Sequence, residues 1–373
     1  MSPSFERIIS LETRLMMEEK MSKGLKRMLL VLNCTMLGLG NVGGPLISRL
    51  YFLKGGKGVW ISSCLETAGW PFMTLPLTIS YLYRRRKDGP GTKVVFMKPP
   101  LFVASVVLGL LTGIDDFLYA YGVARLPIST SALIISTQLA FTAAFAFLLV
   151  KPKFTPFTIN SIFLLTLGAV VLALHTSSDR PANESKLRYF MGFFMTLGAS
   201  ALYGFVLPAI ELTYKKANQT VTYSLVMEMQ MVMSFSATVF CCIGMIFHGD
   251  FKVINRIDSK EHLAIPREAS EYELGQATYY VVLVLNAMLW QMFFMGAVGV
   301  IFSASSLLSG VIIAALLPVT ESLAVLFYHE KFQVEKGVAL VLSLWGSLNY
   351  LYGEFEENKK MEKQNQDLET EIN

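Results

Sequence analysis

Five acidic residues lie inside long apolar stretches of the sequence, where a charge is costly and usually serves a function. They are Glu66, Asp115, Asp116, Glu228 and Glu321. A carboxyl group at this depth can take up a proton, whereas a site for an anionic substrate would be expected to contain Arg or Lys. The pattern favours a neutral or cationic substrate, with Glu66 or Asp115 as the proton-binding group. For Asp116 a packing role is the alternative, and Glu228 fits a partly solvated position near a helix end.

Two tryptophans stand four residues after a polar side chain, a spacing that puts both side chains on one face of a helix. Glu66 precedes Trp70 in LETAGWP, and Asn286 precedes Trp290 in NAMLW. An aromatic face beside a hydrogen-bonding group suits a planar, polar heterocycle, because stacking contributes about 1 to 3 kcal/mol per base. Packing is the competing interpretation for both rings.

Three more polar side chains lie inside the predicted helices. Asn41 belongs to GNVGGP, a run from Gly40 to Pro45 that predicts an interruption of the first helix. Tyr119 shares a helix face with Asp115, and Gln138 is placed in the fourth helix. With a rise of about 1.5 Å per residue, Asn41 is expected at about the same depth as Glu66, Asp115 and Glu321, so these four side chains can form one layer. We therefore predict Asn41, Tyr119 and Gln138 as substrate-binding residues, together with Trp70, Asn286 and Trp290.

The stretches that must position these residues are too apolar for a soluble protein. The chain of 373 residues is 53% hydrophobic and 16% charged, against about 25% charged residues in soluble domains. Its apolar runs repeatedly exceed the length of a membrane-spanning helix. We predict an all-α integral membrane protein with ten transmembrane helices, at 28–50, 59–83, 101–124, 128–150, 155–175, 189–212, 223–247, 278–302, 305–328 and 335–353.

Basic residues predict the orientation of these helices. Lys and Arg are more frequent on the side of the amino terminus, mainly because of the run from Arg84 to Lys87, and basic loops stay in the cytoplasm. We therefore predict a cytoplasmic amino-terminal segment over 1–27 and a cytoplasmic, disordered tail over 354–373.

The two halves of the chain resemble each other. The segment from Phe117 to Phe154 can be laid over the segment that begins at Phe293 with two one-residue gaps. Repeats of five helices, 28–175 and 189–353, would enter the membrane in opposite orientations because five is odd. This predicts a five-plus-five inverted repeat, an architecture of secondary transporters that bind substrate between the halves.

Other classes of protein find little support. The cysteines lie in apolar runs and the histidines show no metal-ligand spacing, so we expect neither a metal nor a cofactor. Motifs of proteases, hydrolases and nucleotide-driven pumps are absent from the sequence, which predicts that the chain is not an enzyme. The net charge of +4 is too small for a nucleic-acid polymer as partner. No obligate protein partner is inferred.

Motifs along most of the chain resemble those of the plant purine permeases, a family of the drug/metabolite transporter superfamily. They include GNVGGPLISRLYF, LETAGWP, GIDDFLYAYGVARLP, ALYGFVLP and LPVTESLAVLFYHEKF. The resemblance extends from about Leu30 to Glu354. It implies the drug/metabolite transporter fold and proton-coupled uptake of adenine, cytokinins and related heterocycles.

We therefore expect a proton symporter for a purine base or cytokinin that works by alternating access in the lipid bilayer. The plasma membrane is the favoured location, with the endoplasmic reticulum or the vacuolar membrane as alternatives. A proton-coupled carrier of another neutral or cationic heterocycle, such as an alkaloid or vitamin, is the second hypothesis. A membrane ligand sensor that does not transport is the third.

Overall fold

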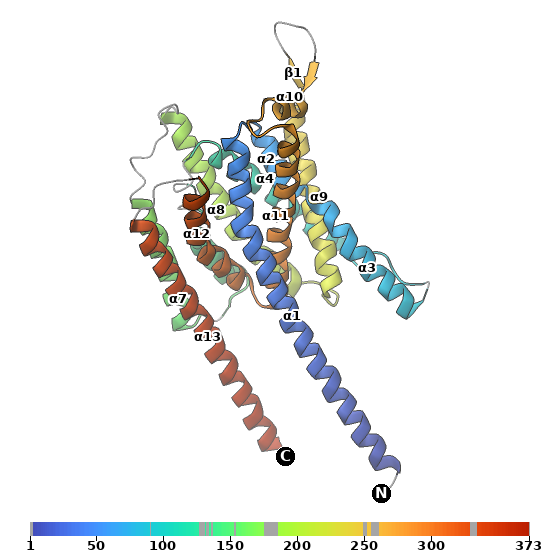
Figure 1. The fold of residues 1–373 in the computed structure, drawn as a ribbon. Coiled ribbons are helices and arrows are strands. Elements are labelled where there is room, and N and C mark those ends of the chain that lie inside the picture. Colours follow the sequence, from blue (N-terminus) through green and yellow to red (C-terminus); the bar gives the residue numbers. More distant parts are fainter. Residues whose placement is uncertain are drawn as a thin grey trace.

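The structure is a computed structural model that consists mainly of long helices (Figure 1). It describes residues 3–89, 91–126, 131, 134–135, 137–152, 154–174, 186–248, 252–254, 261–328 and 334–372. The helices are α1 (Pro3–Leu53), α2 (Val59–Thr67), α3 (Trp70–Asp88), α4 (Pro99–Val123), α6 (Gln138–Leu149), α7 (Pro156–Leu174), α8 (Lys186–Lys215), α9 (Tyr223–His248), α10 (Ala264–Glu271), α11 (Gln276–Ser303), α12 (Ser306–Tyr328) and α13 (Val334–Ile372). Strands β1 (Lys252–Ile254) and β2 (Glu261–Leu263) form a short antiparallel hairpin in which Val253 pairs with His262.

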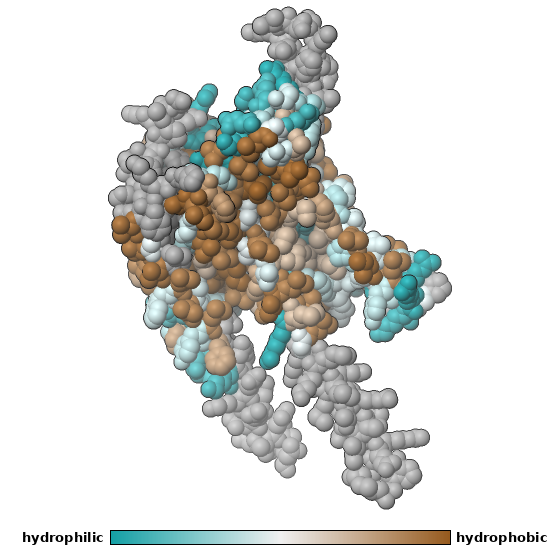
Figure 2. All heavy atoms as spheres, viewed as in Figure 1, coloured by the Kyte–Doolittle hydropathy of each residue, from teal (hydrophilic) through white to brown (hydrophobic). Residues whose placement is uncertain are grey.

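Within the described residues, six helices are long and apolar enough to cross a membrane. They are α4, α8, α9, α11, α12 and the part of α1 that begins at Gly24. The two shorter apolar segments are α6 and the stretch Pro156–Gly168 of α7. Large apolar side chains such as Phe102, Phe147 and Phe194 are exposed on these helices, and Figure 2 shows apolar surface over the middle of the bundle. An apolar surface on this scale fits lipid rather than water, and the chain is a multi-pass membrane protein.

The first helix is continuous where the sequence predicted an interruption. Residues Gly40 to Pro45 lie inside α1, which runs unbroken to Leu53. The glycines instead allow α11 to approach closely, because a Cβ atom on Gly40 would overlap the backbone of Phe293 and Leu289. Small residues at a helix interface commonly serve this purpose in membranes. The predicted break was therefore wrong, and the run is a packing motif.

The predicted second helix is divided into two. α2 ends at Thr67, and α3 begins at Trp70 after Ala68 and Gly69. Pro71 stands in the first turn of α3, where its missing N–H costs nothing, but it cannot continue the hydrogen bonds of α2. Gly69 allows the break to lie directly against α11, since a Cβ atom there would overlap the carbonyl of Ala287. Residues on the two sides of this break do not share a helix face.

The amino end of α1 and the carboxyl end of α13 extend from the same end of the molecule (Figure 1). α13 continues as a helix to Ile372, which differs from the disordered tail predicted over 354–373. The sequence after Gly353 contains no Gly or Pro and is rich in Glu, Lys and Gln. These residues have high helix propensity, which accounts for the difference.

The opposite end of the molecule carries α10, in the connection between α9 and α11 (Figure 1). Lys54, just after α1, forms an ion pair of 3.0 Å with Glu273, and Lys57 contacts Glu271 at 3.5 Å. The hydrogen bond from Arg267, assisted by the charges of Arg267 and Lys57, holds the pKa of Glu271 below its ordinary value. The pairs that Glu271 forms with Arg267 and Lys57 therefore persist at mildly acidic pH.

Candidate functional site

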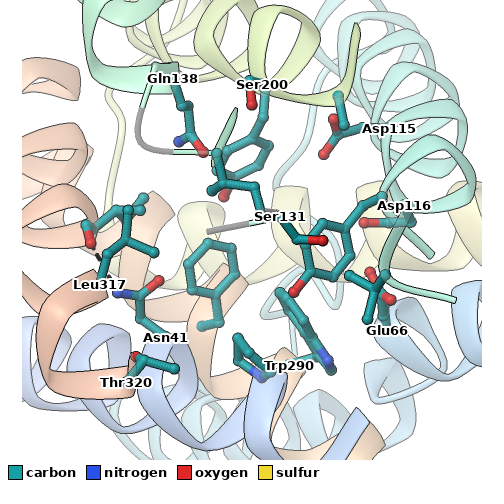
Figure 3. A pocket seen from close by; sticks show the side chains of 18 of the residues that line it. Asn41, Glu66, Asp115, Asp116, Ser131, Gln138, Ser200, Trp290, Leu317 and Thr320 are labelled. Carbon is teal, nitrogen blue, oxygen red and sulfur yellow. Dashed lines mark hydrogen bonds between the residues drawn. The ribbon is translucent and has the colours of Figure 1, made fainter. Parts of the chain in front are cut away.

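A central pocket lies among the helices of both halves of the chain (Figure 3). It holds a cavity of about 100 Å³ and is lined by Asn41, Pro45, Arg49, Glu66, Asp115, Asp116, Tyr119, Val123, Ser131, Ile135, Gln138, Ala199, Ser200, Tyr203, Trp290, Phe293, Phe294, Ile313, Leu317 and Thr320. Aromatic rings and aliphatic side chains form most of the wall. A few polar groups converge on it, as is typical of a small-molecule site.

Regular helix spacing brings these side chains to the pocket. Asn41, Pro45 and Arg49 follow one another at intervals of four on α1, so they form one stripe along that helix. Asp115 and Tyr119 are related in the same way on α4, which confirms that these two residues share a face. Each of these helices therefore contributes a single face to the site.

Three carboxyl groups gather on one side of the pocket. Glu66 comes from α2, and Asp115 and Asp116 come from the middle of α4; all three are buried. Glu66 and Asp116 point toward each other in Figure 3 and lie within hydrogen-bonding range. Two ionised carboxylates can only accept hydrogen bonds, so a bond between them requires a proton on one. Among the described residues, no group of three His, Cys, Asp or Glu side chains could hold a metal ion.

The indole of Trp290 forms another wall of the pocket. Its ring meets Tyr119 edge-on with centroids 5.6 Å apart, and Phe293 in the same manner at 5.3 Å. Gly44 of α1 makes room for the indole, because a Cβ atom there would come within 3.0 to 3.2 Å of its atoms. Trp290 is thus held at mid-helix as part of an aromatic wall, rather than at a membrane interface.

A buried hydrogen-bond chain runs behind this tryptophan. The Trp290 Nε1–H donates to Ser48 Oγ at 3.1 Å, and the Ser48 hydroxyl donates to Asn286 Oδ1 at 3.0 Å. All three residues are buried, and Ser48 comes from α1. Asn286 does not line the pocket, so the structure does not bring it to substrate as the sequence predicted. Its contact through Ser48 instead fixes the orientation of Trp290.

Two amides face the pocket from opposite sides. Asn41 donates from Nδ2 to the carbonyl of Ile313 at 3.0 Å, close to Pro318 in α12. This bond leaves the Asn41 Oδ1 atom available as an acceptor toward the pocket. Gln138 is the first residue of α6, and within the described part of the chain its buried Nε2 has no hydrogen-bond partner. An unsatisfied buried donor of this kind is ready to bind a polar ligand.

Trp70 is the second predicted residue that lies away from the pocket. Its ring packs edge-on against Phe235 of α9 at 5.3 Å, and the Phe235 side chain is exposed on the outer surface. The reason is the break between α2 and α3, which removes the shared face expected for Glu66 and Trp70. Asn41, Glu66, Asp115, Tyr119, Gln138 and Trp290 are the predicted residues that the structure does bring together.

Two other buried acids take no part in the pocket. Glu228 accepts hydrogen bonds from the backbone N–H groups of Phe96 and Met97, at 2.9 and 3.2 Å, and so holds the segment before α4. Glu211, which the sequence analysis did not select, accepts from the Ser306 backbone at 2.8 Å and caps α12. The side chain of Glu321 lies outside the described residues.

Sequence reasoning missed several residues of the pocket. Arg49 was treated as lying at a helix end, because the first span was expected to stop at residue 50, whereas α1 runs to Leu53. The spacing Asn41, Pro45, Arg49 was the available signal. Tyr203 stacks on Phe293 with centroids 5.7 Å apart, and nothing in its local sequence separates it from an ordinary core aromatic.

Apolar helices around a buried pocket with polar and acidic side chains define a multi-pass membrane protein with a central small-molecule site. A family profile described as purine nucleobase transmembrane transport matches residues 28–360. Purine permease 3 of Arabidopsis thaliana is 52% identical over 347 residues, which cover 92% of this chain and 96% of the relative. Purine permease 2 of the same plant is 53% identical, with coverage of 92% and 97%. The chain therefore belongs to the purine permease family, a family of purine nucleobase transporters.

A likeness to a solved structure concerns the fold alone. One crystal structure superposes with a TM-score of 0.57 at 12% sequence identity, covering 88% of this chain and 96% of the other. At this identity the match says that the arrangement of helices recurs in another protein, and it carries no information about substrate.

Proposed function

We propose that this purine permease is a secondary active transporter that takes up adenine and cytokinins together with protons by alternating access. One observation carries the proposal: the buried carboxyl groups of Glu66, Asp115 and Asp116 line the same pocket as the ring of Trp290. The carboxyl groups supply a site for protons, and the ring supplies a stacking surface for a planar base.

The pattern of helix contacts supports a ten-helix inverted repeat. Exchanging α1 with α8, α4 with α11, α6 with α12 and α2 with α9 turns four of the observed helix contacts into four others. Thus α1 packs on α11 as α8 packs on α4, and α1 packs on α12 as α8 packs on α6. The α7 and α13 helices, which would end the two repeats, pack on each other. Such an arrangement suits two halves that rock about a central site.

Substrate recognition follows from the walls of the pocket. In the proposal, the base stacks on Trp290 with Tyr119 at its edge, and the amides of Asn41 and Gln138 hydrogen-bond to ring nitrogens or the exocyclic amine. An amide offers both a donor and an acceptor, which matches the mixed edge of adenine. Asn286 acts indirectly through Ser48, and Trp70 has no contact role.

Proton coupling is assigned to Glu66 or Asp115. A bound base displaces water from these carboxyl groups, and a low-dielectric surrounding favours the neutral form of an acid. Protonation and substrate binding then assist each other, and release of the base to the cytoplasm frees the proton. Uptake of this kind serves a cell best at the plasma membrane, where we place the protein.

The acidic side of the pocket favours a second candidate substrate class. A cationic heterocycle, such as a protonated alkaloid, would be attracted by Glu66, Asp115 and Asp116. It would compete with a proton for these groups, so its uptake would respond to pH in the opposite direction.

Uptake by purified protein in liposomes tests the proposal. With an acidic outer buffer, accumulation of radiolabelled adenine above the level reached without a pH gradient is expected, and collapse of the gradient by a protonophore abolishes it. If adenine inside the liposomes reaches the same level with and without the pH gradient, this would contradict proton coupling. An absence of uptake and binding, with folded protein, would contradict purine transport.

A further inference from the structure

We propose that Glu66 and Asp116 bind the transported proton as a pair, sharing one proton between their two carboxyl groups. This inference rests on the proposed proton coupling and gives it a defined site. It assigns a role to Asp116, for which the sequence left packing and pocket roles open. Asp115, the neighbouring candidate, then faces the substrate without taking part in the shared proton.

The geometry singles out this pair among the three acids. Glu66 is 1% exposed and Asp116 is 2% exposed, and they project from different helices toward each other (Figure 3). They lie within hydrogen-bonding range of one another. Asp115 is one residue earlier on α4, which turns its side chain by about 100° around the helix. It points to another part of the pocket in Figure 3.

The carboxyl oxygens of the pair lack hydrogen-bond donors, and a bound proton would supply one. Within the described part of the chain, neither carboxyl oxygen of Glu66 meets a protein hydrogen-bond donor, and Asp116 Oδ2 has none either. Two buried, adjacent carboxylates cannot both stay ionised at modest cost. One proton removes one charge and also provides the O–H that joins the two groups.

Among the described residues that line the pocket, no side chain other than the carboxyl groups ordinarily titrates below or near neutral pH. The pocket receives Arg49 from α1, Asp115 and Tyr119 from α4, and Tyr203 from α8. Cys241 of α9 interacts electrostatically with Glu66 and Asp116, and α11 adds the non-titrating Trp290. Arg, Tyr and Cys ordinarily lose protons above neutral pH. Among the described groups of the pocket, the carboxyl groups are therefore the ones that ordinarily release a proton below neutral pH.

The transport step is balanced with one proton. In the outward-open state, water delivers a proton to the Glu66–Asp116 pair, and the base then covers it. After the halves rock, the base leaves and the same proton passes to cytoplasmic water. No bond of the substrate is broken and nothing is oxidised. The pair returns with both carboxylates ionised and hydrated by the water that replaces the base, which lowers the cost of the two charges.

Isosteric amide variants test the pair. Adenine uptake into proteoliposomes is measured across external pH for Glu66→Gln, Asp116→Asn, the double variant and wild type. Counterflow exchange of adenine at equal pH is measured on the same preparations, because exchange needs a folded site but no net proton movement. Glu228→Gln is the matched control, since Glu228 is a buried acid outside the pocket that holds only backbone N–H groups.

A proton shared by Glu66 and Asp116 predicts how adenine uptake changes with external pH in each variant. Wild type and Glu228→Gln increase uptake as external pH falls, by at most about tenfold per pH unit. Glu66→Gln and Asp116→Asn each lose this pH dependence of uptake but continue to exchange adenine. The double variant loses no more of the pH dependence than either single variant, as expected for residues that act as a unit. An Asp116→Asn protein that keeps the wild-type slope would overturn the shared proton.

The Asp116→Glu variant and the pH dependence of wild-type uptake separate failure of the pair from failure of folding or of proton coupling. If Asp116→Asn does not exchange adenine, Asp116→Glu, which restores a carboxyl group, is expected to recover the slope; exchange without a slope in that variant contradicts the pair. If wild type itself shows no slope, the proposed proton coupling fails. If instead wild-type uptake depends on pH and only Glu66→Gln removes this dependence, the shared proton is refuted but proton coupling is not.

Discussion

At the scale of single residues, the proposed recognition of a planar base depends most on Trp290. Its indole is fixed from behind by Ser48 and Asn286, and from the side by Tyr119 and Phe293. A ring that is already held in place loses little freedom when a base stacks on it, which favours binding.

Replacing Trp290 by Ala removes the stacking surface. Trp290→Ala is expected to weaken adenine binding by about 1 to 3 kcal/mol, or about 5- to 150-fold in Kd. Equilibrium binding of radiolabelled adenine to purified protein measures the effect. Trp70→Ala serves as the control, because Trp70 packs against Phe235 on the outer surface and should leave Kd near the wild-type value. An unchanged Kd for Trp290→Ala would assign the indole to packing alone.

Ser48 tests whether the ring is positioned from behind. Ser48→Ala removes the acceptor of the indole N–H and is expected to weaken adenine binding by about 0.5 to 1.5 kcal/mol, or about 2- to 12-fold. Because Ser48 acts through Trp290, the substitution should cost little in a Trp290→Ala background. Full additivity of the two losses would show that Ser48 affects binding by another route.

Helical spacing predicted the site residues only where one helix runs through them. Asp115 with Tyr119 on α4 and Asn286 with Trp290 on α11 share a face as expected, although Asn286 proved to lie behind the ring. Glu66 and Trp70 do not, because Gly69 and Pro71 divide the helix at that point. Arg49 was missed since helix ends cannot be read to the residue from hydropathy.

At the scale of elements, the contact of α1 with α11 sets one side of the pocket. Asn41 and Arg49 line it from α1, and Trp290 lines it from α11. Gly40 and Gly44 let the two helices approach, and their presence was interpreted as a break because Gly and Pro also end helices. Sequence alone does not distinguish a helix break from a close contact, since the partner surface is unknown.

A side chain at Gly40 should disrupt this contact. Gly40→Ala places a Cβ atom on the backbone of α11 and is expected to destabilise the protein by about 1 to 3 kcal/mol, as in other overpacked cores. Thermal denaturation in detergent measures the change. Gly24→Ala is the control, because nothing lies within 4 Å of a Cβ atom at that position. Equal stability of the two variants would be incompatible with the observed packing.

At the scale of the whole molecule, charge and shape are distributed unevenly. The carboxyl groups of the pocket come from α2 and α4, whereas α11 and α12 supply Trp290, Phe293 and aliphatic side chains. The proposed repeats are thus alike in fold and different in chemistry. Hydropathy predicted the position of the long apolar helices α4, α8, α9, α11 and α12, because long apolar runs have no other stable state in lipid. It could not predict the extension of α13, which is polar.

The arrangement predicts that both termini face the cytoplasm. They lie at one end of the molecule, together with the basic run from Arg84 to Lys87 at the end of α3. An epitope tag at the carboxyl terminus should be detected by antibody only after cells are permeabilised. Detection on intact cells would reverse the orientation.

The central claim is that purine bases bind between the two halves, and a structure determined with adenine tests it most directly. The account predicts density for the base against the ring of Trp290, within reach of the Asn41 and Gln138 amides. A second cavity, near the start of α4 and the end of α8, is lined by Lys98 and Lys216. Adenine bound there, with the central pocket free of it in a folded, transport-competent preparation, would contradict the account.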